Sequence, residues 1–216
     1  DGYLIDDPTR NVTVTAGDTQ TIVFKNHSTC SLLIKKVCTE NPDKMLEGAV
    51  FDVRYADGTV VGDSNGVFTT GADGTILITG LEANKAIVVT ETKAPDGFAI
   101  DTTPQTITTQ AGKVVQLTFA NVPYGKIIIE KRDSKTNELL PGAEFRVTTA
   151  AGCEVGQNGV IGDTNLTSNG IFTTGADGKI TITNVRPGSY VITEIKAPDG
   201  YLIDDPTRNV TVTAGD

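Results

Sequence analysis

The sequence has little of what most catalytic sites and membrane segments need. It contains a single histidine, His27, which argues against His-rich zinc sites and Ser-His-Asp triads. No apolar run approaches the roughly 20 residues that a membrane-spanning helix requires. Aromatic residues make up only 6% of the 216 residues, so any core must be aliphatic and modest. We therefore expect small β-modules without a metal or a cofactor, rather than one large enzyme fold.

Positive charge is also scarce. Lys and Arg number 18 against 27 Asp and Glu, which gives a net charge of −9. Proteins that bind nucleic acid or anionic lipid need a basic face, so we expect neither a nucleic-acid partner nor membrane insertion. The chain does not begin with Met and has no signal-peptide pattern. Both observations predict that it is a piece of a longer protein.

Internal repeats are the clearest feature that is present. Residues 1–18, DGYLIDDPTRNVTVTAGD, recur unchanged at 199–216, an offset of 198 residues. A weaker repeat lies inside this period: GVFTTGADGTILITGL (66–81) matches GIFTTGADGKITITNV (170–185), and ETKAPDGFAID (91–101) matches EIKAPDGYLID (194–204). The pattern predicts a tandem array in which each period holds two homologous modules of about a hundred residues.

The repeats also suggest where the modules begin and end. We assign residues 29–122 to module 1 and residues 123–216 to module 2. Residues 1–28 are then the last-strand hairpin left over from a preceding repeat. Module 2 has no counterpart of TQTIVFKN (19–26), so we expect it to lack its final strand. The alternative is that the overlap marks an arbitrary fragment boundary and that residues 1–28 are disordered.

The sequence predicts that both modules are all-β. Runs of Val, Ile and Thr alternate with polar residues at period two, and Asp-Gly turn signals separate them. No stretch has a convincing apolar period of 3.6 residues. Many short strands with frequent turns predict a β-sandwich.

The alternation places three polar residues of module 1 in phase with apolar neighbours. They are Lys36 at the end of the first strand, Glu91 in a middle strand and Asn121 in the last strand. The matching positions are Lys131 and Glu194 in module 2, and Asn26 near the N-terminus. Lys35 also lies beside Lys36, but it has the wrong strand parity.

An unpaired buried charge is costly, so we expect each trio to meet. One interpretation is a buried Lys–Glu ion pair with an Asn hydrogen bond, or strand-end residues that merely reach solvent. The other is covalent. Burial lowers a Lys pKa and raises a Glu pKa, and a neutral amine is a nucleophile. Lys would attack the Asn amide, Glu would shuttle protons, and ammonia would leave. This reaction occurs once, so the chain would not be an enzyme acting on external substrates.

The strand Lys, followed by GAxF, GADG, E[TI]KAPDG[FY] and a final strand ending in Asn, resembles the Cna B-type (SpaA-like) domain of Gram-positive surface adhesins and pilins. The resemblance covers essentially the whole chain, twice. It implies tandem reversed immunoglobulin-like, prealbumin-like Greek-key β-sandwiches with self-formed Lys–Asn isopeptide bonds. Carried over by position, Glu91 promotes a Lys36–Asn121 bond in module 1. Glu194 and Lys131 are the module 2 counterparts, with an acceptor of the Asn26 type from another chain or repeat.

The resemblance implies a structural stalk repeat of an extracellular bacterial surface protein that is anchored to the cell wall in its full-length form. The expected partners are neighbouring repeats, with head-to-tail strand donation between chains sealed by a Lys131–Asn26 bond. A pilus subunit is a variant of this role. The alternative function is an adhesive module that binds host extracellular matrix or another surface protein.

The three cysteines have no CxxC spacing, which argues against a metal site. Cys30 and Cys38 are too far apart along one continuous strand to pair. Cys38 and Cys153 should lie at the poles where the two modules meet, which makes them candidates for an inter-module disulfide. The alternative is free thiols.

Overall fold

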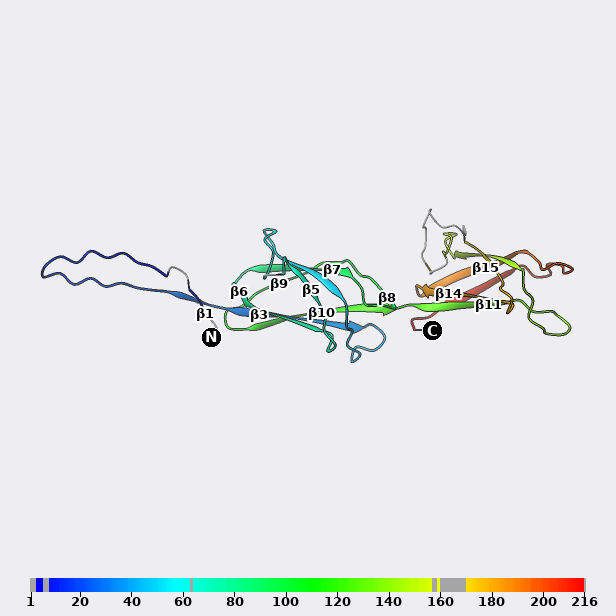
Figure 1. Ribbon diagram of the computed structural model, residues 1–216, viewed down its shortest axis with the longest axis horizontal. Helices are drawn as coiled ribbons and strands as arrows, with labels where there is room; N and C mark the ends of the chain where they lie inside the picture. Colours follow the sequence, from blue (N-terminus) through cyan, green and yellow to red (C-terminus); the bar gives the residue numbers. More distant parts are fainter. Residues whose placement is uncertain (1–2, 6–7, 63, 157–158, 160–169, 216) are drawn as a thin grey trace. The chain divides into compact units, whose positions relative to one another are not determined.

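A computed structural model of the chain describes residues 3–5, 8–62, 64–156, 159 and 170–215. The described residues form β-strands and no helix, which confirms the predicted all-β class (Figure 1). The chain divides into two compact units. One contains residues 1–96 and 100–121, and the other contains residues 97–99 and 122–216.

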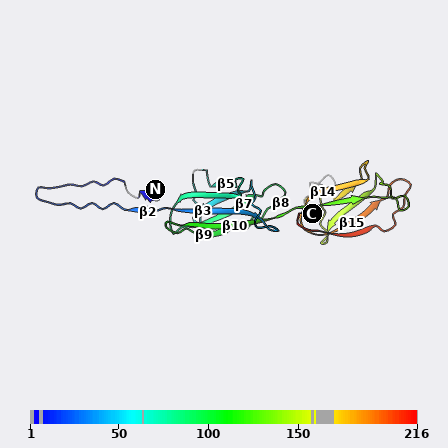
Figure 2. The same cartoon turned by 90° about the horizontal axis from the view of Figure 1, so that it is seen from below.

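Module 1 is a sandwich of two four-stranded sheets, with strand orders β6-β3-β10-β8 and β5-β4-β7-β9 (Figures 1 and 2). Alternate residues of the strands face inward, as a period-two pattern requires, and form one aliphatic core with Phe51 and Phe119. The strands are β3 (Cys30–Cys38), β4 (Val50–Tyr55), β5 (Val67–Thr69), β6 (Thr75–Leu81), β7 (Ala86–Lys93), β8 (Phe98–Ala99), β9 (Gln105–Thr108) and β10 (Val114–Pro123).

The first and last long strands of module 1 are neighbours. β10 pairs with β3 in parallel, with Phe119 opposite Lys36 and Asn121 opposite Cys38. The other edge of β3 pairs antiparallel with β6, so β3 lies inside its sheet. A residue at the end of β3 and one at the end of β10 therefore come to the same end of the sandwich.

Module 2 repeats most of this arrangement. One sheet has the order β13-β12-β15-β16, and the other, within the described residues, pairs β11 with β14. Its core gathers inward residues from both sheets, including Ile127, Phe145 and Tyr190. The strands are β11 (Gly125–Glu130), β12 (Glu144–Thr149), β13 (Ile171–Thr173), β14 (Lys179–Val185), β15 (Gly188–Lys196) and β16 (Thr207–Val212).

The N-terminal segment reproduces one pairing of module 1. β1 (Tyr3–Ile5) pairs antiparallel with β2 (Asn26–Ser28), with Tyr3 opposite Ser28. The aligned residues of module 1, Phe98 and Pro123, are likewise opposite each other in β8 and β10. Residues 8–25 are exposed and form the long loop between β1 and β2 (Figure 1).

Three further expectations concern a membrane span, a metal site and a disulfide. No helix within the described ranges is long and apolar enough to cross a membrane. The same ranges contain no cluster of His, Cys, Asp or Glu that could hold a metal ion. All three cysteines are free: Cys30 and Cys38 are buried, and Cys153 is exposed. Neither Cys38 nor Cys153 is paired in the structure, and the inter-module disulfide between them stays a prediction.

Candidate functional site

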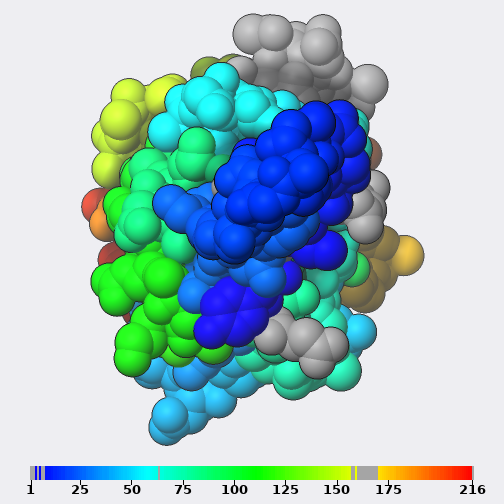
Figure 3. Space-filling model, turned by 90° about the vertical axis from the view of Figure 1, so that its left-hand side faces the viewer, coloured from blue at the N-terminus to red at the C-terminus, as the bar shows by residue number. Residues whose placement is uncertain are grey.

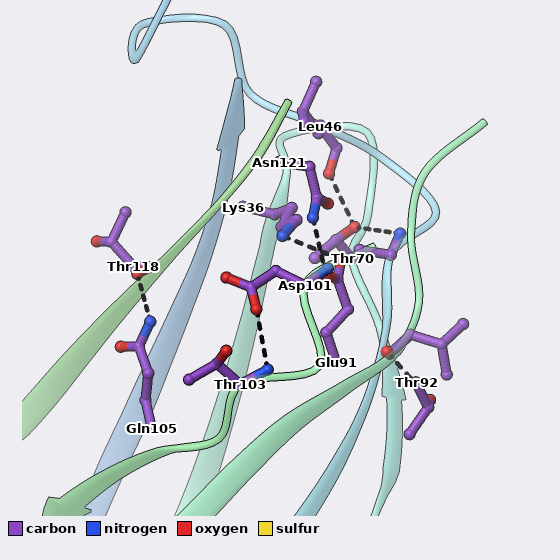
Figure 4. A network of polar contacts seen from close by, with 12 residues as sticks. Lys36, Leu46, Thr70, Glu91, Thr92, Asp101, Thr103, Gln105, Thr118 and Asn121 are labelled. Carbon is purple, nitrogen blue, oxygen red and sulfur yellow. Dashed lines mark hydrogen bonds and ion pairs between the residues drawn. The ribbon is translucent and has the colours of Figure 1, made fainter. Parts of the chain in front are cut away.

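The structure brings together the three residues of module 1 that the alternation singled out. Lys36 lies on β3 and Asn121 on β10 of one sheet, and Glu91 faces them from β7 of the other sheet (Figure 4). Their exposed fractions are 0% for Lys36 and Glu91 and 1% for Asn121. An ionic group without solvent needs partners close by, and each of these residues finds them within the trio.

The carboxylate of Glu91 connects the lysine to the amide. Its Oε1 lies 3.0 Å from Lys36 Nζ, an ion-pair contact without hydrogen-bond geometry. Its Oε2 accepts hydrogen bonds from Asn121 Nδ2 at 2.8 Å and from the backbone N–H of Asp101 at 3.1 Å. Asn121 Oδ1 is buried and has no hydrogen-bond partner among the described residues. The amine and the amide are thus held by the two oxygens of one carboxylate.

Two aromatic rings enclose the amine. Lys36 Nζ lies 5.8 Å from the ring centroid of Phe51 and 5.8 Å from that of Phe119. The two rings themselves are 4.8 Å apart. Burial in these surroundings lowers the pKa of Lys36 below its ordinary value, although the close, negatively charged carboxylate of Glu91 acts in the opposite direction. A lowered pKa makes the neutral, nucleophilic amine more accessible.

The backbone around Lys36 is fixed by the GADG turn. The Lys36 N–H donates to Gly74 O at 2.9 Å, and the Leu46 N–H donates to Lys36 O at 2.9 Å. The buried hydroxyl of Thr70 donates to Leu46 O at 2.8 Å and accepts from the Ala49 N–H at 3.0 Å. These contacts hold the strand end in one position (Figure 4).

Module 2 has the same scaffold. The N–H of Lys131 donates to Gly178 O at 3.0 Å, and Thr174 makes the two hydrogen bonds that correspond to those of Thr70. Sequence reasoning missed both threonines. The TTGADG motif that the two modules share could have pointed to them.

The ionic pair of module 2 is more open than that of module 1. Lys131 Nζ donates to Glu194 Oε2 at 2.8 Å, and the lysine side chain is 18% exposed. Glu194 Oε1 is buried and has no hydrogen-bond partner within the described residues. A groove of about 470 Å³ runs past the pair, lined among others by Ile129 and Phe145.

The remaining candidates lie elsewhere. Asn26 is exposed at the start of β2, where it pairs through its backbone with Ile5. Lys35 is partly exposed and has the opposite parity to Lys36 on β3. Of the six residues predicted to form or promote the two bonds, Asn26 is the one that the described structure places outside a Lys–Glu site.

Comparisons with known proteins identify the modules. The model of the SpaA family, a prealbumin-like fold domain, matches residues 30–123 and 125–216. No curated protein matches the chain.

Several solved structures are similar. The Bacillus anthracis TIE protein is 26% identical with a TM-score of 0.42, over 86% of this chain and 31% of that one. A streptococcal ancillary pilin is 24% identical with a TM-score of 0.46, over 93% and 64%. The shaft pilin SpaA from Lactobacillus rhamnosus GG is 17% identical with a TM-score of 0.43, over 87% and 94%. The chain thus spans about a third of the first protein's length and under two thirds of the second's.

Proposed function

Because this chain belongs to the SpaA family of prealbumin-like fold domains, we propose that it is a structural repeat of a bacterial cell-surface stalk whose module 1 links Lys36 to Asn121 covalently. The observation that supports the link most directly is the single buried carboxylate of Glu91, which contacts both reacting side chains. The tandem repeats suit a stalk, since identical units supply length rather than a unique surface. Its partners would be neighbouring repeats, and its location the bacterial cell surface.

The reaction balances without an external reagent. Glu91 takes a proton from the Lys36 ammonium, which leaves a neutral amine beside a protonated carboxyl. Nζ then forms a bond to Asn121 Cγ, and the bond from Cγ to Nδ2 breaks. The carboxyl passes its proton to the departing nitrogen, and the remaining amine proton returns to Glu91 or leaves with solvent. Ammonia is released, and an isopeptide bond remains.

The position of the proposed bond would let it carry a pulling force along a stalk. It joins the first long strand of module 1 to the last, close to where β10 ends. A force that pulls on the two ends of the module would pass from β3 through the bond into β10. Most of the sandwich, from residue 37 to residue 120, would then remain unloaded.

Intact mass under denaturing and reducing conditions tests the link. We expect the wild-type monomer to be lighter than its formula by one ammonia. Lys36→Ala and Glu91→Gln should both restore the full mass, because the first removes the nucleophile and the second removes the proton acceptor. Lys35→Ala is the matched control and should keep the deficit. A wild-type monomer with its full formula mass would refute the proposed link.

A further inference from the structure

The two oxygens of the Glu91 carboxylate have different surroundings. Oε2 accepts hydrogen bonds from Asn121 Nδ2 at 2.8 Å and from the Asp101 N–H at 3.1 Å. Oε1 lies 3.0 Å from Lys36 Nζ and has no hydrogen-bond partner among the described residues. Rotation about the last side-chain bond of Glu91 would exchange the two oxygens, so the donors on Oε2 decide which oxygen faces the amine. The oxygen they leave free is the one that receives the Lys36 proton in the proposed reaction.

The two donors on Oε2 differ in what happens to them during the reaction. Asn121 Nδ2 is the atom that departs as ammonia, and its side chain must change position as the link forms. The Asp101 N–H belongs to the main chain and takes no part in the bond changes. A hydrogen bond to a carboxylate is charge-assisted and strong, and a reacting group has to be held to within about half an ångström. The Asp101 N–H can therefore support the Glu91 side chain throughout the reaction.

The Asp101 N–H is itself held in place from both sides. Asp101 Oδ1 accepts a hydrogen bond from the Thr103 N–H at 3.0 Å, which closes an Asx turn directly after it (Figure 4). Before it, Phe98 and Ala99 of β8 pair with the end of β10. The hydrogen bonds from Thr103 also lower the pKa of the Asp101 carboxyl, so this acceptor is ionised at neutral pH.

Packing does not explain an aspartate at this position. Asp101 is exposed, and so is Thr103. The same residue nevertheless follows the glutamate by ten positions in both modules, in ETKAPDGFAID (91–101) and EIKAPDGYLID (194–204). An exposed loop residue that recurs beside a buried reactive site is better explained by the site than by the core.

We propose that Asp101 is a positioning residue for the Lys36–Asn121 link: its side chain fixes the turn, and its N–H holds Oε2 of Glu91 so that Oε1 faces the amine. Glu91 then presents one oxygen to the proton of Nζ and the other to the amide that loses Nδ2. Asp101 donates to Oε2 and acts on the reaction only through Glu91. The inference rests on the proposed function, because it concerns the rate at which that link forms.

Three variants of the full chain separate the turn from the N–H. Asp101→Asn keeps a side-chain oxygen for the turn, Asp101→Ala removes it, and Asp101→Pro removes the N–H as well. Each chain is recovered from inclusion bodies in urea, where its full formula mass is confirmed, and dilution then starts folding. Intact mass gives the rate of ammonia loss once circular dichroism shows that folding is complete. We expect Asp101→Asn to react nearly as fast as the wild type, Asp101→Ala more slowly, and Asp101→Pro about tenfold slower.

A matched control lies in the same module. Asp57 accepts a hydrogen bond from the Thr59 N–H at 2.9 Å, in a turn of the same kind as that of Asp101 and Thr103. It lies between β4 and β5, in a segment that Figure 3 shows in cyan at the surface. Asp57→Ala should leave the rate of ammonia loss unchanged even if it lowers the melting temperature. If Asp101 served stability alone, Asp101→Ala would behave in the same way.

Two outcomes would overturn this inference alone. One is an equal rate of ammonia loss in Asp101→Ala and Asp101→Asn, and the other is a rate in Asp101→Pro that matches or exceeds that of the wild type. If Asp101→Pro does not fold, the comparison of the other two variants decides. In all these cases the wild type still loses one ammonia, and the proposed function stands. A wild type that keeps its full formula mass after folding would overturn both.

Discussion

Replacing Asn121 by Ala removes the acceptor of the proposed link and leaves the Lys36–Glu91 ion pair in place. The link would close a loop of about 85 residues between positions 36 and 121. Loop-closure entropy for that length corresponds to about 4.5 kcal/mol of stability. We therefore expect Asn121→Ala to lower the melting temperature of module 1 by roughly 20–35 °C.

A second background separates the loss of the link from the other effects of Asn121→Ala. Lys36→Met with Glu91→Met replaces the buried ion pair by apolar side chains of similar length, a change that is often close to neutral. Neither the link nor the hydrogen bond to Glu91 can form there, so adding Asn121→Ala should be close to neutral. Differential scanning calorimetry of the four variants gives the difference directly. Equal losses in the two backgrounds would refute the covalent reasoning.

Three further predictions follow from the site. In Asn121→Ala, Lys36 is a free amine whose pKa is lowered in the folded state, so the unfolded state binds more protons than the folded state. The free energy of unfolding should therefore rise with pH toward the ordinary lysine pKa of 10.5, as measured by melting at a series of pH values. Adding Lys36→Met to that chain should remove the rise. Thr70→Val leaves two buried backbone groups without their partner and should cost about 1–3 kcal/mol in urea unfolding, whereas Thr69→Val on the exposed face should cost little. Gly74→Ala should destabilise module 1 by a similar amount, because φ is +66° there and a Cβ would lie 2.7 Å from the Leu46 nitrogen; an unchanged urea midpoint would contradict this.

Strict alternation made part of the site predictable. A strand sends successive side chains to opposite faces, so the phase of Leu32 and Ile34 was enough to turn Lys36 inward. The same reasoning placed Glu91 and Asn121, and the repeated motifs indicated a tandem β-sandwich. These features depend on neighbours in the sequence, which the sequence displays directly.

Other parts of the site depend on contacts between distant segments. Thr70, just after β5, bonds to Leu46 and Ala49 ahead of the neighbouring strand β4, and the N–H of Asp101 reaches back to Glu91. A bulge between Val50 and Phe51 sets which residue lies opposite Glu91. The shared TTGADG motif marks Thr70, but no local pattern identifies the partners of these contacts.

The parallel pairing of β3 with β10 also affects the order of folding. It joins segments separated by more than 80 positions, whereas hairpins such as β4 with β5 close short loops. Pairing two strands that are far apart in the sequence costs more loop-closure entropy than forming a hairpin. We therefore expect β10 to dock late when the chain folds for the first time. A bond formed after that docking would hold the two strands together through every later unfolding. The chain would then refold faster than it first folded. A fast refolding rate would show that the sandwich had formed once before and that the bond had been made.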